Sequence, residues 1–376
     1  MNGREKVLVA MSGGVDSSVA ACLLKEQGYD VVGVFMRLGA VDPAEETQSE
    51  RLGHDSERIP RHRSCCSAAD AADARAVAGR LGIPFYALNF EADFAKLIDD
   101  FADEYAAGRT PNPCILCNHR LKFGKLLAYA RAVDANLIAT GHYARIDTRQ
   151  GRPRLRRATH LAKDQSYVLF QLEPDVLRQM RFPLGDLSKE EVRAIAKGLG
   201  LSLHDKPDSQ DICFVPDRDY APVVHRRRPD AFRPGDIRHT NGQVLGKHDG
   251  MARFTVGQRR GLRIAAGAPL YVTDIDPDSA TVTVGPREAT FVEEAVATDV
   301  LWHGGVPASP LRTNVKIRYN HAPVPAEVTP LPGGRVRVRF DEPQPAVTPG
   351  QALVMYDGDI VLGGGWLTRL QRPETI

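Results

Sequence analysis

The chain has no long hydrophobic run, and this absence argues against a helical membrane protein. Nowhere do about eighteen apolar residues follow one another, although a helix needs roughly that length to cross a bilayer. The first residues, MNGREKVLVAM, lead directly into a strand pattern and contain neither a secretory hydrophobic region nor an Arg/Ser-rich transit pattern. We therefore expect a cytoplasmic protein without a membrane anchor.

Cysteine and net charge are also low. Six irregularly spaced cysteines among 376 residues do not suit a secreted disulfide scaffold, so reduced thiols, metal ligands and redox groups remain. A net charge of +2 does not by itself indicate a nucleic-acid binder. Arginines do cluster in RQGRPRLRRA, HRRRP and GQRRGLR. Each cluster alone is most simply a solvated surface loop, although several together could neutralise phosphates.

The residues present predict a multidomain protein that begins with an α/β fold. Strand and helix patterns alternate from KVLVAM to FYALNF, which indicates a doubly wound parallel sheet with helices on both faces. Beyond DSQDICF the texture changes to short strands separated by Gly, Pro, Asp and Asn. We predict a catalytic α/β domain at 1–219, a small central β-rich domain at 220–291 and a C-terminal β-barrel-like domain at 292–376. The polar, aperiodic residues 39–64 are predicted to form a long surface loop.

The strongest local pattern is Ser12-Gly13-Gly14-Val15-Asp16-Ser17-Ser18, between a predicted strand and a predicted helix. A glycine turn before a helix start collects backbone N–H groups and the positive helix end around one point, which suits a phosphate. The Walker pattern requires a lysine that is missing here, so kinase and GTPase chemistry are disfavoured. A plain Gly-Ser turn is the alternative.

The cysteines form a second pattern. Cys114 and Cys117 lie in PNPCILCN, whose prolines are expected to interrupt the helices on either side and to display both thiols on a rigid loop. Cys213 lies in the polar segment DSQDICF. A CxxC pair alone fits half a zinc site, a redox pair or a chance pair in a structural turn.

Several motifs together resemble one family. SGGVDSS, GRTPNPCILCNHRLKFG, ATGHYAR, KDQSYVL, DSQDICF, TVGQRRGL and VTPGQALV occur in this order, as in the tRNA-specific 2-thiouridylases of the PP-loop ATP pyrophosphatase superfamily. Many short motifs in a fixed order are much more specific than one motif alone.

The resemblance implies an ATP-dependent sulfurtransferase that converts the wobble uridine of the tRNA anticodon loop to 2-thiouridine. ATP adenylates the C2 oxygen, with Mg²⁺ positioned by Asp16, and a cysteine persulfide then supplies sulfur. Met36 and Gly141 are expected beside the adenine. The full nucleotide set implied is Ala10, Met11, Ser12, Gly13, Gly14, Val15, Asp16, Ser17, Met36 and Gly141.

The resemblance also assigns the sulfur chemistry. Cys213 carries the persulfide, which a persulfide-carrying donor protein loads, and Cys117 is the nucleophile that is left in a disulfide with Cys213 after turnover. One well-known form of the family has Asp at position 114, whereas this chain has Cys114. Three thiolates at 114, 117 and 213 could instead hold an iron–sulfur cluster.

For tRNA, the resemblance assigns two groups of residues. Those expected at the target base are Asn112, Pro113 and Cys114. Those expected elsewhere on the tRNA are His142, Lys163, Asp164, Gln165, Arg318, Tyr319 and Gln351. Cations suit phosphates, and a tyrosine ring can stack on an unpaired base.

Two other functions stay open at this stage. Another PP-loop enzyme, either an amide-forming synthetase or a tRNA-modifying ligase, would use ATP without needing paired thiols. A zinc-stabilised RNA-binding module would use the thiols without catalysis.

Overall fold

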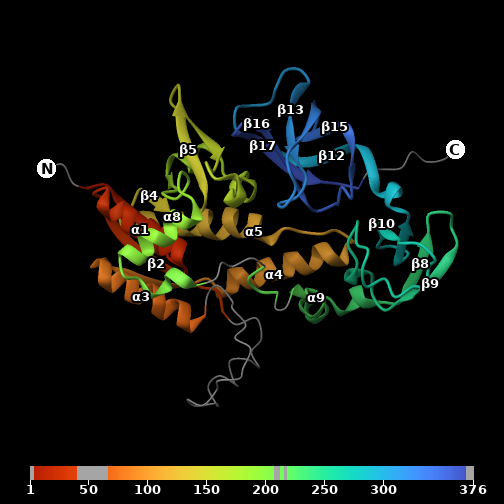
Figure 1. The fold of residues 1–376 in the computed structure, drawn as a ribbon, viewed down its shortest axis with the longest axis horizontal. Helices are drawn as coiled ribbons and strands as arrows, with labels where there is room; N and C mark the ends of the chain where they lie inside the picture. Colours follow the sequence, from red (N-terminus) through yellow and green to blue (C-terminus); the bar gives the residue numbers. More distant parts are fainter. Residues whose placement is uncertain (1–3, 40–66, 207–211, 216–217, 370–376) are drawn as a thin grey trace, which may run out of the picture. The chain divides into compact units, whose positions relative to one another are not determined.

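The computed structural model describes residues 4–39, 67–206, 212–215 and 218–369 (Figure 1). It divides into two compact units. Unit 1 comprises Met1–Leu97, Leu116–Ser166 and Pro174–Asp219, and unit 2 comprises Ile98–Ile115, Tyr167–Glu173 and Tyr220–Ile376. The predicted surface loop lies, from residue 40 onward, outside the described residues, as do Cys65 and Cys66.

Unit 1 is built on a five-stranded parallel sheet with the order β3-β2-β1-β4-β7. The strands are β1 Lys6–Ala10, β2 Asp30–Arg37, β3 Phe85–Asn89, β4 Leu137–Ala139 and β7 Met180–Arg181. Val7 and Val9 on one face of β1 and Leu8 on the other are all buried. Burial on both faces is typical of a parallel sheet covered on both sides, and it confirms the predicted α/β class.

The helices of unit 1 begin and end at recognisable signals. The main helices of unit 1 are α1 Val15–Glu26, α3 Ala68–Leu81 and α8 Lys189–Gly198, and α4 Glu91–Ala106 begins in this unit. Both α3 and α8 start with a capping box, Ser67 with Asp70 and Ser188 with Glu191, which satisfies backbone N–H groups that the helix leaves unpaired. Side chains of α1, α3 and α8 share one apolar core with β1 and β2.

The first arginine cluster forms a hairpin, not the predicted loop. Strands β5 Ala144–Arg149 and β6 Arg152–Arg157 pair in an antiparallel register. The two residues between them, Gln150 and Gly151, both have positive φ, as a tight hairpin turn requires. Arg154 and Arg156 both bind the carboxylate of Asp147, so part of this positive charge is neutralised locally.

The segment with two cysteines also differs from the prediction. It is helical from residue 113 to 132, as α5 Pro113–Leu116, the π-helix η1 Cys117–Lys125 and α6 Leu126–Ala132. Pro113 does not break the helix because it occupies the first helical position, where no N–H is needed. Cys114 and Cys117 therefore lie on helical turns. π-Helical segments are rare and occur frequently at functional sites.

Unit 2 contains two β structures. A four-stranded sheet has the order β10-β11-β8-β9, and a six-stranded barrel has the order β12-β15-β14-β13-β16-β17 and closes through pairing of β17 with β12. This confirms the β-rich C-terminal part. The sheet strands are β8 Gly235–His239, β9 Val244–His248, β10 Tyr271–Asp276 and β11 Thr281–Gly285. The barrel strands are β12 Phe291–Trp302, β13 Leu311–Lys316, β14 Val324–Leu331, β15 Arg335–Pro345, β16 Ala352–Asp357 and β17 Ile360–Leu367.

Alternating side chains fill the barrel. On β15, Val336, Val338 and Phe340 are buried in its core, whereas the intervening arginines 335, 337 and 339 are exposed, as the period of two predicts. The remaining short helices are α7 Pro174–Arg178, α9 Ala221–Arg227, and the 3₁₀ segments η2 Leu161–Lys163, η3 Ser166–Leu169, η4 Ser202–Asp205, η6 Pro229–Phe232, η7 Met251–Arg253 and η8 Arg287–Thr290. Of the helices that the structure describes, none has the length and apolarity to cross a membrane.

Candidate functional site

The glycine turn of SGGVDSS joins the end of β1 to the start of α1, as predicted. Gly14 is the N-cap of α1, so the first N–H groups of the helix face the turn. Gly13 has a φ of +71°, and a Cβ built on it would lie 2.2 Å from the carbonyl oxygen of Asp70 in α3. Only glycine fits this position, because any side chain would collide with backbone atoms.

The serine hydroxyls shape this turn. Ser17 Oγ accepts a hydrogen bond from the Ser12 N–H at 3.1 Å and donates one to the Gly14 carbonyl at 3.2 Å. Ser18 Oγ also donates to the Gly14 carbonyl, at 2.9 Å. In this structure these hydroxyls hold the main chain of the turn in a compact bend.

Asp16 lies in a network that the sequence alone did not reveal. Its Oδ1 accepts hydrogen bonds from Tyr143 Oη at 2.8 Å and from Lys189 Nζ at 2.7 Å. Lys189 is 8% exposed and is the first residue of α8. Gly141, at the end of β4, lies so close that a Cβ there would be 2.7 Å from the Ser17 nitrogen. The motif ATGHYAR, which contains the predicted Gly141 and His142, could have pointed to Tyr143 as a site residue. For Lys189 the only sequence signal is the capping box at the start of α8.

A second lysine reaches the turn from far along the chain. Lys206 Nζ donates to the Gly13 carbonyl at 2.9 Å, and it binds Asp70 Oδ1 at 2.6 Å and Asp73 Oδ2 at 2.9 Å. Burial by itself would lower the pKa of Lys206, but the hydrogen bonds and charges of Asp70 and Asp73 outweigh it and raise that pKa. The turn is thus bordered by two lysines, neither at the Walker position.

Met36 and the cysteines take different environments. Met36 is half-buried near the end of β2, where it pairs in register with Leu88. Cys117 and Cys213 belong to unit 1 and are half-buried, whereas Cys114 is exposed. Among the residues with described positions, no group of three His, Cys, Asp or Glu side chains is arranged to hold a metal. The described residues therefore give no support to the iron–sulfur cluster considered for Cys114, Cys117 and Cys213.

Neighbouring side chains fix the segments that carry these cysteines. The Asn112 side-chain oxygen accepts a hydrogen bond from the Cys114 N–H at 3.2 Å, which caps the start of α5. Beside Cys213, the buried Phe214 packs edge-on against Phe94, with ring centroids 5.6 Å apart.

The predicted tRNA residues of unit 1 are firmly anchored. His142 is buried near Phe123 and Phe182, and its Nδ1 lies 2.7 Å from Thr140 Oγ1. Burial, together with the charge of Lys122, lowers the pKa of His142 well below its usual range, which favours the neutral form of the ring.

Three consecutive predicted residues follow β6. The buried Asp164 carboxylate binds Arg157 Nε at 2.9 Å and accepts the Ser166 N–H at 3.1 Å. Gln165 accepts the Tyr143 N–H through its side chain at 2.9 Å, which links this segment to the network around Asp16. Lys163 is half-buried at the end of η2.

The predicted tRNA residues of unit 2 lie on or beside the barrel. Tyr319 is 36% exposed, and its ring packs edge-on against Tyr167. Arg318 donates a hydrogen bond to the Pro345 carbonyl at 2.5 Å. Burial lowers the pKa of the Arg318 guanidinium, and its buried Nε has no hydrogen-bond partner. Gln351 donates to the Thr110 carbonyl at 2.8 Å.

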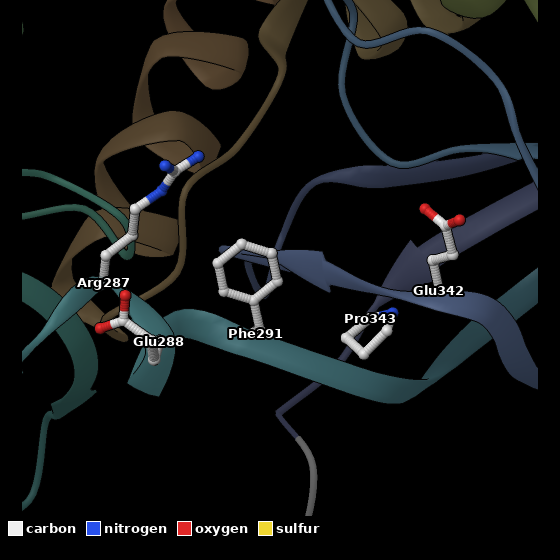
Figure 2. A pocket seen from close by; sticks show the side chains of 5 residues that line it. All are labelled: Arg287, Glu288, Phe291, Glu342 and Pro343. Atoms are coloured by element: carbon white, nitrogen blue, oxygen red, sulfur yellow. The ribbon is translucent and has the colours of Figure 1, made fainter.

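A pocket of about 580 Å³ in unit 2 lies elsewhere, between η8 and the ends of β12 and β15 (Figure 2). Arg287, Glu288, Phe291, Glu342 and Pro343 line it. Arg287 lies over the Phe291 ring, 5.8 Å from its centroid. None of the predicted site residues belongs to this pocket, and its acidic and basic groups suggest no particular ligand.

Family models match three consecutive segments of the chain. Residues 5–217 match the tRNA methyl transferase HUP domain, residues 223–286 the tRNA methyl transferase PRC-barrel domain, and residues 292–367 the aminomethyltransferase beta-barrel domain. These segments resemble the three predicted domains, although the boundaries at 220 and 292 remain predictions.

Some solved structures resemble part of the chain. A 4-thiouridine synthetase in complex with RNA and bound ATP has a TM-score of 0.36 at 17% identity, over 60% of this chain and 51% of that one. The U34-tRNA thiolase NcsA from Methanococcus maripaludis, with its [4Fe-4S] cluster, has a TM-score of 0.32 at 17% identity, over 61% of this chain and 66% of that one.

Curated relatives resemble the whole chain. A tRNA-specific 2-thiouridylase MnmA from Geotalea uraniireducens is 48% identical over 100% of this chain and 98% of its own length. The protein of the same name from Geobacter metallireducens is 49% identical over 97% of each chain. Because identity near one half extends over nearly the full length, the chain belongs to the tRNA-specific 2-thiouridylase family.

Proposed function

We propose that this protein is an ATP-dependent tRNA-uridine 2-sulfurtransferase that replaces the C2 oxygen of the wobble uridine with sulfur. Family membership supports the reaction class. The observation that carries the proposal within the molecule is the combination of one anion-binding turn at α1 with two half-buried cysteines in the same unit.

The turn at Gly13 and Gly14 suits the pyrophosphate half of ATP. Backbone N–H groups and the positive end of α1 stabilise phosphate charge. Asp16 has a side chain that is 33% exposed, and its carboxylate is the hard oxygen ligand that Mg²⁺ prefers. Lys189 and Tyr143 hold this carboxylate through Oδ1, so Asp16 would meet the metal in a fixed orientation.

The reaction needs activation before sulfur can enter. In the proposed sequence the C2 oxygen attacks the α-phosphorus of ATP and pyrophosphate leaves, which turns a poor leaving group into AMP. The terminal sulfur of a Cys213 persulfide then bonds to C2 and AMP leaves. The Cys117 thiolate attacks the Cys213 sulfur and breaks the S–S bond, so the sulfur stays on the base and a Cys117–Cys213 disulfide remains. An external thiol reductant restores both cysteines.

Several features of unit 2 support tRNA as the substrate. Tyr319 exposes part of a ring that can stack on an unpaired base. The guanidinium of Arg318 is partly buried, and a guanidinium can donate hydrogen bonds to a phosphate oxygen of RNA. We propose an anticodon loop as the bound element, because its bases are more easily unstacked than bases in a helix.

Mass spectrometry of tRNA nucleosides tests the proposal. The wild-type protein, incubated with tRNA, MgATP and a persulfide donor, is expected to form 2-thiouridine. Formation should stop when ATP is omitted. Cys117→Ser and Cys213→Ser should each reduce the yield by at least about a hundredfold, because a hydroxyl neither carries sulfane sulfur nor resolves a persulfide. Cys22→Ala, which changes a buried cysteine of α1, is the matched control and should stay active.

The same assay separates the alternatives. A PP-loop ligase of another kind would consume ATP in the presence of tRNA and remain active in both serine variants. A binding module would release no pyrophosphate. Anaerobic purification followed by iron and sulfide analysis tests the cluster hypothesis, and a colourless, active protein would remove it.

A further inference from the structure

The ammonium of Lys206 is fully oriented by its neighbours. A lysine has three N–H donors, and three acceptors surround this one: the Gly13 carbonyl, Asp70 Oδ1 and Asp73 Oδ2. The distances, between 2.6 and 2.9 Å, are those of strong hydrogen bonds. This lysine is therefore engaged with the loop and α3.

The contact with Gly13 fixes the direction of the next N–H group. The described chain contains no cis peptide bond, and in a trans peptide the C=O and N–H point in opposite directions. Because the Gly13 carbonyl points toward Lys206, the Gly14 N–H points away from Lys206 and α3. Gly14 is the N-cap of α1, so its N–H belongs to the group that an anion would meet at the helix start.

A peptide between two glycines is the easiest kind to rotate, because neither residue has a Cβ that restricts φ and ψ. Rotation of this peptide would turn the carbonyl of Gly13 toward the anion and remove a donor from it. A partly buried main-chain contact to a charged group opposes that rotation, since breaking it removes the hydrogen bond of the Gly13 carbonyl to the ammonium.

We propose that Lys206 is a positioning residue that holds the Gly13–Gly14 peptide in the orientation that presents the Gly14 N–H to the terminal phosphates of ATP. The inference rests on the proposed function, which places the pyrophosphate half of ATP at this turn. Asp70 and Asp73 hold the ammonium behind the loop. Asp70 also forms the capping box of α3 and contacts Gly13 through its backbone.

Calorimetric titration of the full-length protein with MgATP and, separately, with AMP tests this role. Lys206→Met should weaken ATP binding about tenfold, the effect of one lost charge-assisted contact of roughly 1.4 kcal/mol. AMP lacks the terminal phosphates, so its affinity should change less than about twofold. Lys206→Arg keeps a cationic donor and should recover most of the ATP affinity. Lys197→Met, which replaces an exposed lysine of α8, is the matched control.

The results separate this role from a purely structural one. A methionine variant with wild-type ATP affinity would overturn the inference, and so would an equal loss of ATP and AMP binding, which would mean general loosening of unit 1. If Lys206→Met does not fold, Asp73→Asn gives the same comparison. This variant removes one of the two carboxylates that hold the ammonium and leaves the α3 cap intact. We expect about threefold weaker ATP binding and unchanged AMP binding. Wild-type protein that binds no ATP would instead refute the proposed function, and this inference with it.

Discussion

At the scale of single residues, the importance of a glycine to the site depends on the atoms packed around it. Gly13 and Gly28 both have positive φ, at +71° and +91°, but their surroundings differ. A Cβ at Gly13 would meet the backbone of Asp70, whereas nothing lies within 4 Å of a Cβ at Gly28. A substitution at Gly28 would therefore cause backbone strain alone, whereas a substitution at Gly13 would also cause a steric collision.

Gly13→Ala should weaken ATP binding more than tenfold, because either the turn or α3 has to move to accommodate the methyl group. Gly28→Ala should cost only the strain of a left-handed alanine, about 1 kcal/mol of unfolding free energy, and leave ATP affinity unchanged. Titration calorimetry and thermal unfolding of both variants measure the two effects. Equal ATP affinities in the two variants would contradict the assigned packing of α3 on the turn.

At the scale of elements, the turn before β16 contacts the segment that leads to Asn112. The Thr110 N–H donates to the Pro349 carbonyl at 2.8 Å, and Gln351 donates to the Thr110 carbonyl at 2.8 Å. A Cβ at Gly350 would lie 2.9 Å from Arg109 Cβ. The VTPGQALV motif thus fixes the chain just before the helix that carries Cys114.

Gln351→Ala should loosen this segment without unfolding the barrel. Loss of one neutral hydrogen bond, worth about 1 kcal/mol, predicts roughly fivefold faster amide exchange. Hydrogen–deuterium exchange followed by mass spectrometry measures it in peptides covering residues 107–115. Gln243→Ala, in the exposed turn between β8 and β9, should leave these peptides unchanged. Unaltered exchange in the Gln351 variant would mean that its side chain does not hold the segment.

At the scale of the whole molecule, the two units share a sensitivity to acid. Among the residues that the structure describes, burial is the first cause of a lowered pKa at four histidines. These are His142, His248, His303 and His321. Their neutral form is favoured in the folded state, so below about pH 6.5 the unfolded chain binds more protons. As the pH falls, each such group therefore lowers the unfolding free energy until its folded pKa is reached.

Thermal unfolding at pH 7.5 and pH 5.5 should therefore show a lower midpoint at the acidic pH. His303→Gln should reduce this difference, because it removes one buried imidazole outside the predicted site and retains a side-chain donor for the Phe170 carbonyl, which lies 2.8 Å from His303 Nε2. An identical pH dependence in the variant and the wild type would show that His303 does not contribute.

Local patterns in the sequence determined the α/β class, the glycine turn and the strand alternation of β15. These features depend on neighbours two to four residues apart, so periodicity and turn chemistry report them directly. The motif order also indicated the family. The helical start at Pro113 was missed, because a proline is compatible both with a loop and with the first position of a helix.

Only the tertiary structure decided which partners meet at the site. Lys189 and Lys206 bind Asp16 and the Gly13 carbonyl across 173 and 193 residues, and no local pattern encodes contacts at such separations. Packing also decided that much of the basic charge near β6 faces carboxylates of the same unit. Short-range preference follows from each residue and its neighbours, whereas charge pairing and close backbone approach exist only once distant segments are folded together.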